Sequence, residues 1–248
     1  MTEQKAIANY LKFTGNKSID IKAALIDMDG VLYDSMKNHT RAWVKLMTKN
    51  GIKCTRDEFY QYEGMTGEAI IQQKFKAGAG KNITVDEAKA LYGVKARYFH
   101  ELGEVGKVNG IDNVLAEFKK AGLECILVTG SGQKTILDRI SNDFPGVFSE
   151  KRVTSADVKH GKPNPEPYLI GMNLAEAKAN QCIVLENAPL GVMAGHAAGC
   201  FTVAVTTGPI PEKDLYKAGA DIVYPNMDAL AQALPSLIEQ LAATNQQQ

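Results

Sequence analysis

The stretch Ala23-Ala24-Leu25-Ile26-Asp27-Met28-Asp29-Gly30-Val31 decides the fold prediction. Its first four residues form a short apolar run, which is typical of a strand buried on both faces. Asp27 and Asp29 follow, and residues i and i+2 of extended backbone point the same way, so both can face one ligand. Gly30 then permits a sharp turn. Buried carboxylates are costly unless a cation meets them, so the stretch predicts a site for a metal ion and phosphate. A solvated Asp-Gly turn is the alternative.

Three further polar motifs occur along the chain, namely Thr129-Gly130-Ser131, Gly161-Lys162-Pro163-Asn164-Pro165 and Glu186-Asn187. The first and the third come directly after short apolar runs, as Asp27 does. The second precedes a helix that a proline is expected to open. The carboxyl ends of the strands of an open parallel sheet converge on one crevice. We therefore expect all these groups to meet in a single site.

The part of the chain beyond residue 104 alternates between strand and helix patterns. Apolar runs predict strands at 125–128, 182–185 and 201–205, and helical stretches lie near 111–121, 132–142, 165–178 and 189–198. Strands that alternate with helices predict right-handed βαβ units and a parallel sheet. The predicted fold class is therefore α/β, with a Rossmann-like parallel sheet as the core and an α-helical cap domain inserted into it.

The cap is predicted from residues 34–106, where apolar residues recur at helical spacing and no run resembles a strand. Its hinges are expected at Tyr33–Met36 and Gly103–Asn109, since glycine can absorb a change of backbone angles. The predicted domains are an N-terminal extension at 1–21, a catalytic core at 22–35 and 104–248, and a cap at 36–103.

The two ends of the chain are predicted to differ. Ala6, Ile7, Tyr10 and Leu11 recur at helical spacing, so the extension is expected to form a short amphipathic helix that lies on the core. It has no continuous apolar stretch, which argues against a signal peptide. The polar tail from Ala242 is expected to fray.

Composition is that of a soluble enzyme. The 248 residues carry 28 Lys plus Arg and 28 Asp plus Glu, so the basic excess of a nucleic-acid-binding protein is missing. No apolar run approaches the roughly 18 residues of a membrane helix. The four cysteines lack metal-type spacing, and we expect buried free thiols in a cytoplasmic protein. Their positions are Cys54, Cys125, Cys182 and Cys200.

Taken together, these motifs resemble the haloacid dehalogenase superfamily, in particular its β-phosphoglucomutase-like phosphotransferases. The resemblance extends from about Lys22 to about Ala231 and includes His39–Trp43 and the stretch 187–192. It implies that Asp27 is the nucleophile, forming a short-lived acyl phosphate, and that Asp29 is the general acid and base. Thr129 would hold phosphoryl oxygens, and Lys162 would supply fixed positive charge.

The resemblance also implies a cofactor and a substrate site. Mg²⁺ would be held by Asp27, the main-chain carbonyl of Asp29, and the pair Glu186-Asn187. A small phosphorylated substrate would contact residues from both the core and the cap. Those residues are predicted to be Gly130, Ser131, Asn164, Glu63, Gly64 and Thr66.

Two departures from the family pattern bear on the reaction. The usual second carboxylate of the acidic pair is replaced by Asn187, so the metal site loses one negative charge. The cap loop 62–67 lacks the arginine that phosphoglucomutases place after it to grip a second phosphate, and carries Glu63 instead. Glu63 is either a solvated loop residue or a carboxylate that enters the closed site and restores the missing charge.

The resulting functional prediction is a monomeric Mg²⁺-dependent phosphohydrolase that acts on a small phosphorylated metabolite or inorganic pyrophosphate. The alternative is a β-phosphoglucomutase, which must bind a bisphosphorylated sugar. A phosphoacceptor switch of the response-regulator type is a further alternative, although receiver domains are about half as long and lack the helical insert. A dehalogenase needs no Mg²⁺ and lacks an acid corresponding to Asp29. The sequence does not identify the substrate, and it does not fix the oligomeric state.

Overall fold

A computed structural model describes residues 1–244, apart from the side chains of 149 and 150. The core is one six-stranded parallel sheet with the strand order β3-β2-β1-β4-β5-β6, which confirms the predicted fold class. The strands are β1 (Ala23–Ile26), β2 (Glu124–Val128), β3 (Phe148–Val153), β4 (Cys182–Glu186), β5 (Phe201–Val205) and β6 (Ile222–Tyr224). The strand that carries the decisive stretch, β1, lies in the middle of the sheet, between β2 and β4.

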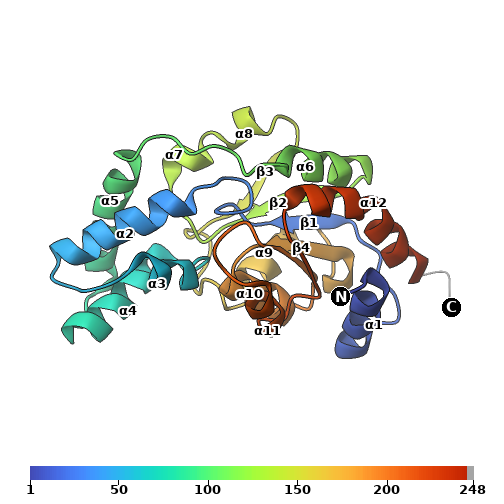
Figure 1. Cartoon of the computed structure of the whole chain (residues 1–248), viewed down its shortest axis with the longest axis horizontal. Coiled ribbons are helices and arrows are strands. Elements are labelled where there is room, and N and C mark those ends of the chain that lie inside the picture. The colour runs from blue at the N-terminus through green and yellow to red at the C-terminus, as the bar shows by residue number, and fades with distance from the viewer. Residues whose placement is uncertain (245–248) are drawn as a thin grey trace.

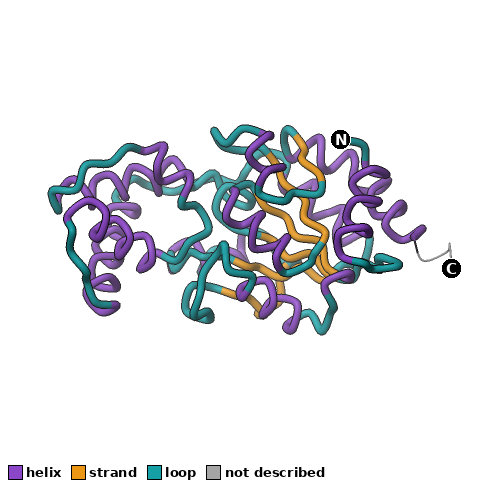
Figure 2. The backbone as a smooth tube through the Cα atoms, turned by 90° about the horizontal axis from the view of Figure 1, so that it is seen from below, coloured by secondary structure: helices purple, strands orange, loops and turns teal. Residues whose placement is uncertain are grey.

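Alternate side chains of β1 enter two different apolar clusters, one on each face of the sheet. Ala24 and Ile26 pack with α6 (Ile111–Lys120) and α12 (Met227–Ala243), whereas Ala23 and Leu25 pack with α9 (Glu166–Leu174) and α10 (Pro189–Ala197). Figure 1 shows these helices above and below the sheet, and Figure 2 shows the strands between them from another side. Burial on both faces explains why β1, β4 and β5 are almost entirely apolar, with Glu186 at the end of β4 and Thr202 in β5 as the exceptions.

Some elements differ from the sequence prediction. The strands β3 and β6 were not predicted, because they lie at the two edges of the sheet, where β3 carries charged residues and β6 is only 3 residues long. The predicted helix at 132–142 is interrupted, giving α7 (Lys134–Leu137) and α8 (Ile140–Asp143). The helix predicted at 165–178 ends earlier, at Leu174.

The insert after β1 consists of helices joined by loops and contains no strand in its described residues. It contains α2 (Met36–Lys49), α3 (Arg56–Gln61), α4 (Gly67–Ala79) and α5 (Val85–His100), which enclose an apolar cluster of their own. Figure 1 shows this unit beyond one end of the sheet. The two predicted hinge segments run side by side, since Asp34 N donates to Gly106 O at 3.0 Å and Val108 N donates to Leu32 O at 2.9 Å. We refer to this helical insert as the cap.

The remaining elements lie around the core. The predicted N-terminal helix is α1 (Glu3–Thr14), in which Ala6, Ile7 and Tyr10 are buried against the core. Helix α12 continues to Ala243, so fraying from Ala242 was wrong for the first residues of the tail, and 245–248 lie outside the described residues. Two short helices complete the chain, namely a 3₁₀ turn at Ala179–Gln181 and α11 (Glu212–Lys217).

Two further expectations concern the whole chain. Cys125, Cys182 and Cys200 are buried free thiols as expected, whereas Cys54 is only partly buried. Within residues 1–244, no helix is both long enough and apolar enough to cross a membrane.

Candidate active site

The side chain of Lys162 joins the ends of three neighbouring strands. Its Nζ donates to Asp27 Oδ1 at 2.5 Å after β1, to Val128 O at 3.1 Å on β2, and to Glu186 Oε1 at 2.6 Å on β4. Tyr168 of α9 also donates its hydroxyl to Glu186 Oε1, at 2.7 Å. The structure therefore brings together three residues that lie far apart in the sequence and that the motifs predicted to meet.

Burial and neighbouring groups of opposite charge have opposite effects on the pKa values of Asp27 and Lys162. Burial raises the pKa of Asp27, and the neighbouring ammonium of Lys162 opposes that rise. Burial lowers the pKa of Lys162, but the carboxylates of Asp27 and Glu186 outweigh this effect, and the net shift is upward. Lys162 is therefore a permanent cation that stabilises negative charge on Asp27 in a place that water does not reach.

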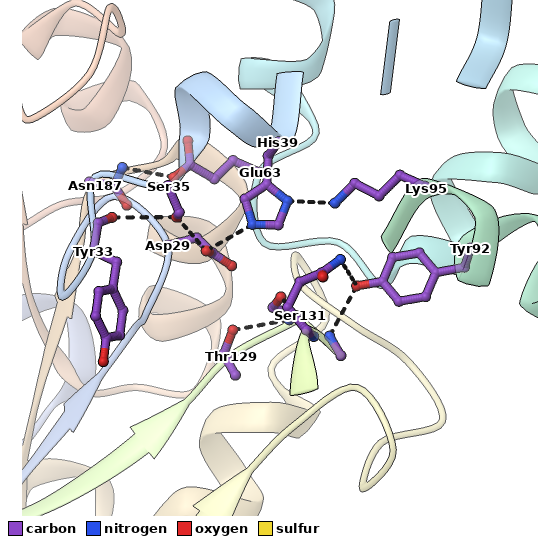
Figure 3. A network of polar contacts seen from close by, with 12 residues as sticks. Asp29, Tyr33, Ser35, His39, Glu63, Tyr92, Lys95, Thr129, Ser131 and Asn187 are labelled. Carbon is purple, nitrogen blue, oxygen red and sulfur yellow. Dashed lines mark hydrogen bonds and ion pairs between the residues drawn. The ribbon is translucent and has the colours of Figure 1, made fainter. Parts of the chain in front are cut away.

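Asp29 lies in a separate hydrogen-bond network that involves the cap (Figure 3). Its Oδ1 accepts a hydrogen bond from the Ser35 hydroxyl and lies 3.0 Å from Nε2 of His39. The other ring nitrogen of His39, Nδ1, is 2.5 Å from Nζ of Lys95 on α5. Because the lysine nitrogen donates, Nδ1 accepts and Nε2 carries the proton that is donated to Asp29.

Burial is the largest influence on each ionisable group of this network. It raises the pKa of Asp29, but His39, Ser35 and Lys95 outweigh it and lower that pKa to about 2. Burial, with the charge of Lys95, lowers the pKa of His39. Burial also lowers the pKa of Lys95 to about 7, although Asp29 opposes the shift. At neutral pH, Asp29 is thus ionised and His39 is neutral. Lys95 gains or loses its proton close to neutral pH.

The cap loop meets the core at Glu63. This side chain is only 7% exposed, and its Oε1 accepts a hydrogen bond from Nδ2 of Asn187 at 2.9 Å. Gly30 makes the contact possible, because it has φ +80° and a Cβ there would lie 2.1 Å from Asn187 Nδ2. Of the two alternatives for Glu63, the solvated loop residue is therefore excluded in this arrangement, because the carboxylate is buried between the cap and the core.

The residues around Glu63 suit a hard divalent cation. Burial, followed by the negative charges of Asp27, Glu186 and Asp29, raises the pKa of Glu63 well above its usual range. Asn187 Oδ1 is buried and lacks a hydrogen-bond partner. An excess of buried carboxylates beside an unpaired amide oxygen is a donor set that fits Mg²⁺. The described residues contain no ready-made group of three or more His, Cys, Asp or Glu ligands, because the predicted set includes an amide and a main-chain carbonyl.

Between the cap and the core lies a partly open chamber of about 40 Å³. At about 10–15 Å³ for each water-sized occupant, it has room for roughly three. Asp27, Asp29 and Thr129 line its core side, and Trp43 and Phe59 are among the apolar residues that line its cap side. As long as the cap is in this position, the chamber itself has room for a phosphoryl group but not for a hexose as well, and Glu63 also borders a second cavity of about 460 Å³.

The structure places most of the predicted substrate-binding residues at this chamber. Glu63, Gly64, Gly130 and Ser131 line it. Thr66 and Asn164 do not. Thr66 lies at the start of α4 against Gly161, and exposed Asn164 accepts a hydrogen bond from Glu166 N at 2.9 Å at the start of α9. A structural role therefore accounts for Asn164 without a substrate contact.

Four residues near the reacting carboxylates were not predicted, namely Ser35, His39, Tyr92 and Lys95. The Tyr92 hydroxyl accepts a hydrogen bond from Gly132 N at 3.1 Å and so links the cap to the core. His39 lies in the stretch His39–Trp43 that carries part of the family resemblance, and Lys95 lies on the same helical face as Leu91, Tyr98 and Phe99. A lysine on the apolar face of a helix indicates a buried charge that needs a partner.

Three known proteins are similar to this chain. Hexitol phosphatase A of Escherichia coli is 31% identical over 185 residues, which cover 74% of this chain and 82% of that protein. The β-phosphoglucomutase of Bacillus subtilis is 26% identical over 198 residues, covering 76% and 84%. A solved structure from Bacteroides vulgatus, provisionally named a β-phosphoglucomutase, is 43% identical with a TM-score of 0.92 and covers 96% of this chain and 98% of its own.

The family model of the haloacid dehalogenase-like hydrolases matches residues 24–205. This interval begins in β1, ends with β5 and includes the whole cap together with every motif described above. On this match, and on the relatives that share it, the chain belongs to the haloacid dehalogenase-like hydrolase family.

Proposed function

We propose that the chain is a Mg²⁺-dependent phosphohydrolase that acts through an aspartyl phosphate on a compact substrate, either a small phosphorylated metabolite or inorganic pyrophosphate. The observation that carries the proposal is the chamber of about 40 Å³, in which a buried Glu63 from the cap reaches Asn187 beside the nucleophile. A metal site completed by the cap and a chamber without room for a sugar both favour a compact substrate.

Asp27 is the nucleophile in this proposal. A carboxylate oxygen attacks phosphorus, the bond from phosphorus to the leaving oxygen breaks, and an acyl phosphate forms on Asp27. Lys162, bound to Asp27 at 2.5 Å, neutralises the charge that spreads over the phosphoryl oxygens. Thr129, at the end of the adjacent strand, and the backbone N–H of Gly130 position those oxygens.

Asp29 protonates the leaving oxygen and then deprotonates the attacking water. Its pKa of about 2 leaves it ionised at neutral pH, which is the form required for the second step. The acid form arises when the negative charge of the substrate beside it raises that pKa. Ser35 and His39 fix the orientation of the carboxylate, and His39 is in turn held by Lys95 of the cap.

The residues that would hold Mg²⁺ are Asp27, the main-chain carbonyl of Asp29, Asn187 and Glu63. When bound, the ion supplies positive charge to the phosphoryl oxygens. Glu186 remains a predicted ligand, but its Oε1 is engaged by Lys162 and Tyr168, and its Oε2 accepts from Asn187 N at 3.1 Å. We therefore assign Glu186 mainly to holding Lys162 in place.

A β-phosphoglucomutase is the second candidate, and the similarity to proteins with that name favours it. Of the cap lysines available for a second phosphate, Lys74 is paired with Glu58 at 2.5 Å, and Lys76 and Lys81 are exposed and do not line the chamber. Lys95 does line it, but it is already bound to His39. The charges in the cap therefore favour hydrolysis over mutase activity.

A turnover screen with Mg²⁺ tests the choice of reaction. Pyrophosphate and two-carbon or three-carbon phosphate esters should give kcat/KM values at least about ten-fold above those of hexose phosphates, because the chamber excludes a hexose. Phosphate release and conversion of β-glucose 1-phosphate to glucose 6-phosphate are measured in parallel. Faster isomerisation of the sugar than hydrolysis of any substrate would establish the mutase instead.

Substitution of the two aspartates separates their roles. Asp27→Asn should reduce turnover by about 10⁴-fold or more, because the amide cannot form the acyl phosphate. Asp29→Asn should cost about 10²-fold or more and should allow phosphate to accumulate on Asp27, since water is no longer deprotonated. Acid quenching and intact-mass measurement detect the adduct. A near-normal rate for either variant would remove the role assigned to it.

A double-mutant cycle tests the metal site. Glu63→Gln keeps a hydrogen-bond acceptor for Asn187 but removes the charge, so apparent Mg²⁺ affinity should fall by about ten-fold or more, and kcat should fall with it. Asn187→Asp should restore part of the loss in the double variant, because it returns the charge from the core side. Strictly additive effects would show that Glu63 and Asn187 do not share a metal ion.

Burial of Lys95 should lower the free energy of unfolding of the chain at neutral pH. Its pKa is about 7 in the folded chain and about 10.4 when unfolded, so between these values the unfolded chain binds more protons and the folded chain gains stability as pH rises. Lys95→Met should therefore raise the free energy of unfolding at pH 7 by about 1 kcal/mol or more, with a smaller gain near pH 10. Urea titrations with Lys89→Met, an exposed lysine of the same helix, provide the control. An equal gain in the free energy of unfolding at both pH values would contradict the prediction that burial lowers the pKa of Lys95.

A further inference from the structure

A second recess lies at the boundary between the cap and the core, on the α5 side. It consists of two adjoining cavities of about 440 Å³ and 340 Å³, and both are lined by His100 and Thr135. One wall is the end of α5 and the hinge segment 103–105, and the other is the segment 132–139 with α7. We call this recess the α5–α7 groove; Figure 1 shows the two helices that border it.

The groove is separate from the chamber of the active site. No residue that lines either of its two cavities lines the chamber. The hydrogen bond between the Tyr92 hydroxyl and Gly132 N lies between the two spaces, because Tyr92 lines the chamber and Gly132 lines the groove. A ligand in the groove would therefore leave the reacting carboxylates accessible.

One end of the groove carries cations without partners. Among the described residues, the side chains of Arg97, His100 and Lys134 make no hydrogen bond or ion pair. Glu101, the acidic residue at this end, is engaged by Lys45 at 2.7 Å. At the other end, Arg139 is bound to Asp143 and to Val105 O, and Glu104 is exposed. Because Glu101 is paired with Lys45, Arg97 and Lys134 leave the α5 end with a net positive charge.

The floor of the groove is apolar. Phe99, Val105 and Ile136 line the cavity from the packed core and are 3%, 6% and 2% exposed, so small apolar parts of them reach its floor. Cavities of 300–1,000 Å³ with mostly apolar walls and a few polar groups are typical small-molecule sites. An apolar floor beside unpaired cations matches a ligand that has an apolar body and an anionic end.

We propose that the α5–α7 groove binds a small organic anion that has an apolar body and a single carboxylate or phosphate group. The body covers Phe99 and Ile136, and the anionic group lies between Arg97 and Lys134. Because α5 belongs to the cap and Lys134 to the core, the bound anion connects the two units. Its affinity is therefore coupled to the position of the cap.

The test uses 1-naphthoate as the probe and 1-naphthalenemethanol as its neutral counterpart, with ¹³C-labelled isoleucine methyl groups read by NMR. The Ile136 methyl reports on the groove, and the Ile70 methyl reports on the chamber. Naphthoate should shift Ile136 saturably without shifting Ile70, and the neutral alcohol should bind about five-fold more weakly or worse. Shifts confined to Ile70, or equal affinity of the two probes, would overturn the proposal.

A charge reversal adds a matched comparison. Lys134→Glu should weaken naphthoate binding by about five-fold or more, because it places a negative charge beside the anion. Lys119→Glu changes the net charge equally at an exposed position on α6 and should leave the affinity unchanged. Lys134 and Lys119 are both exposed, so the fold should tolerate either substitution. Turnover of the active-site substrate by each variant checks that the fold is intact. Equal affinities of the two variants would contradict a site at Arg97 and Lys134.

Discussion

The ammonium of Lys162 holds together the ends of β1, β2 and β4, and the rest of the site depends on it. Two carboxylates and a main-chain carbonyl meet at this nitrogen, and its side chain is 0% exposed. Without that cation, Asp27 and Glu186 would be buried charges of the same sign, which a protein interior does not tolerate. The sheet thus holds Asp27, the proposed nucleophile, in a buried position where Lys162 favours its ionised form against the effect of burial.

The cap contributes what the core lacks. Asn187 leaves the acidic pair one charge short, and Glu63 approaches it from the cap at 2.9 Å. The cap also supplies His39 and Lys95, which hold the acid and base Asp29. In the proposed function, movement of the cap therefore changes three features together, namely the ligands of the metal ion, the residues that hold Asp29, and the size of the chamber. In that proposal, chemistry is confined to the closed arrangement, which keeps out bulk water but retains the attacking water.

The parts predicted from the sequence are those with a local signal. Strands buried on both faces are continuous apolar runs, so β1, β4 and β5 were visible, whereas the edge strands β3 and β6 were not. Asp27 was predicted from a motif at the end of a strand, and Lys162 from a motif that precedes a proline-opened helix. The contact of His39 with Lys95 depends on how α5 packs against α2, 56 residues away, and no local pattern encodes it. The same applies to Glu63, whose burial results from cap closure.

The central claim is that Glu63 and Asn187 bind one metal ion with the cap closed. Crystals grown with Mn²⁺ in place of Mg²⁺ and with a bound phosphate analogue give the most direct measurement, because anomalous scattering locates the ion. The account predicts a peak within bonding distance of Asn187 Oδ1 and a Glu63 carboxylate oxygen, beside Asp27. A peak beside Asp27 with Glu63 turned away from the ion, with the cap closed, would contradict it.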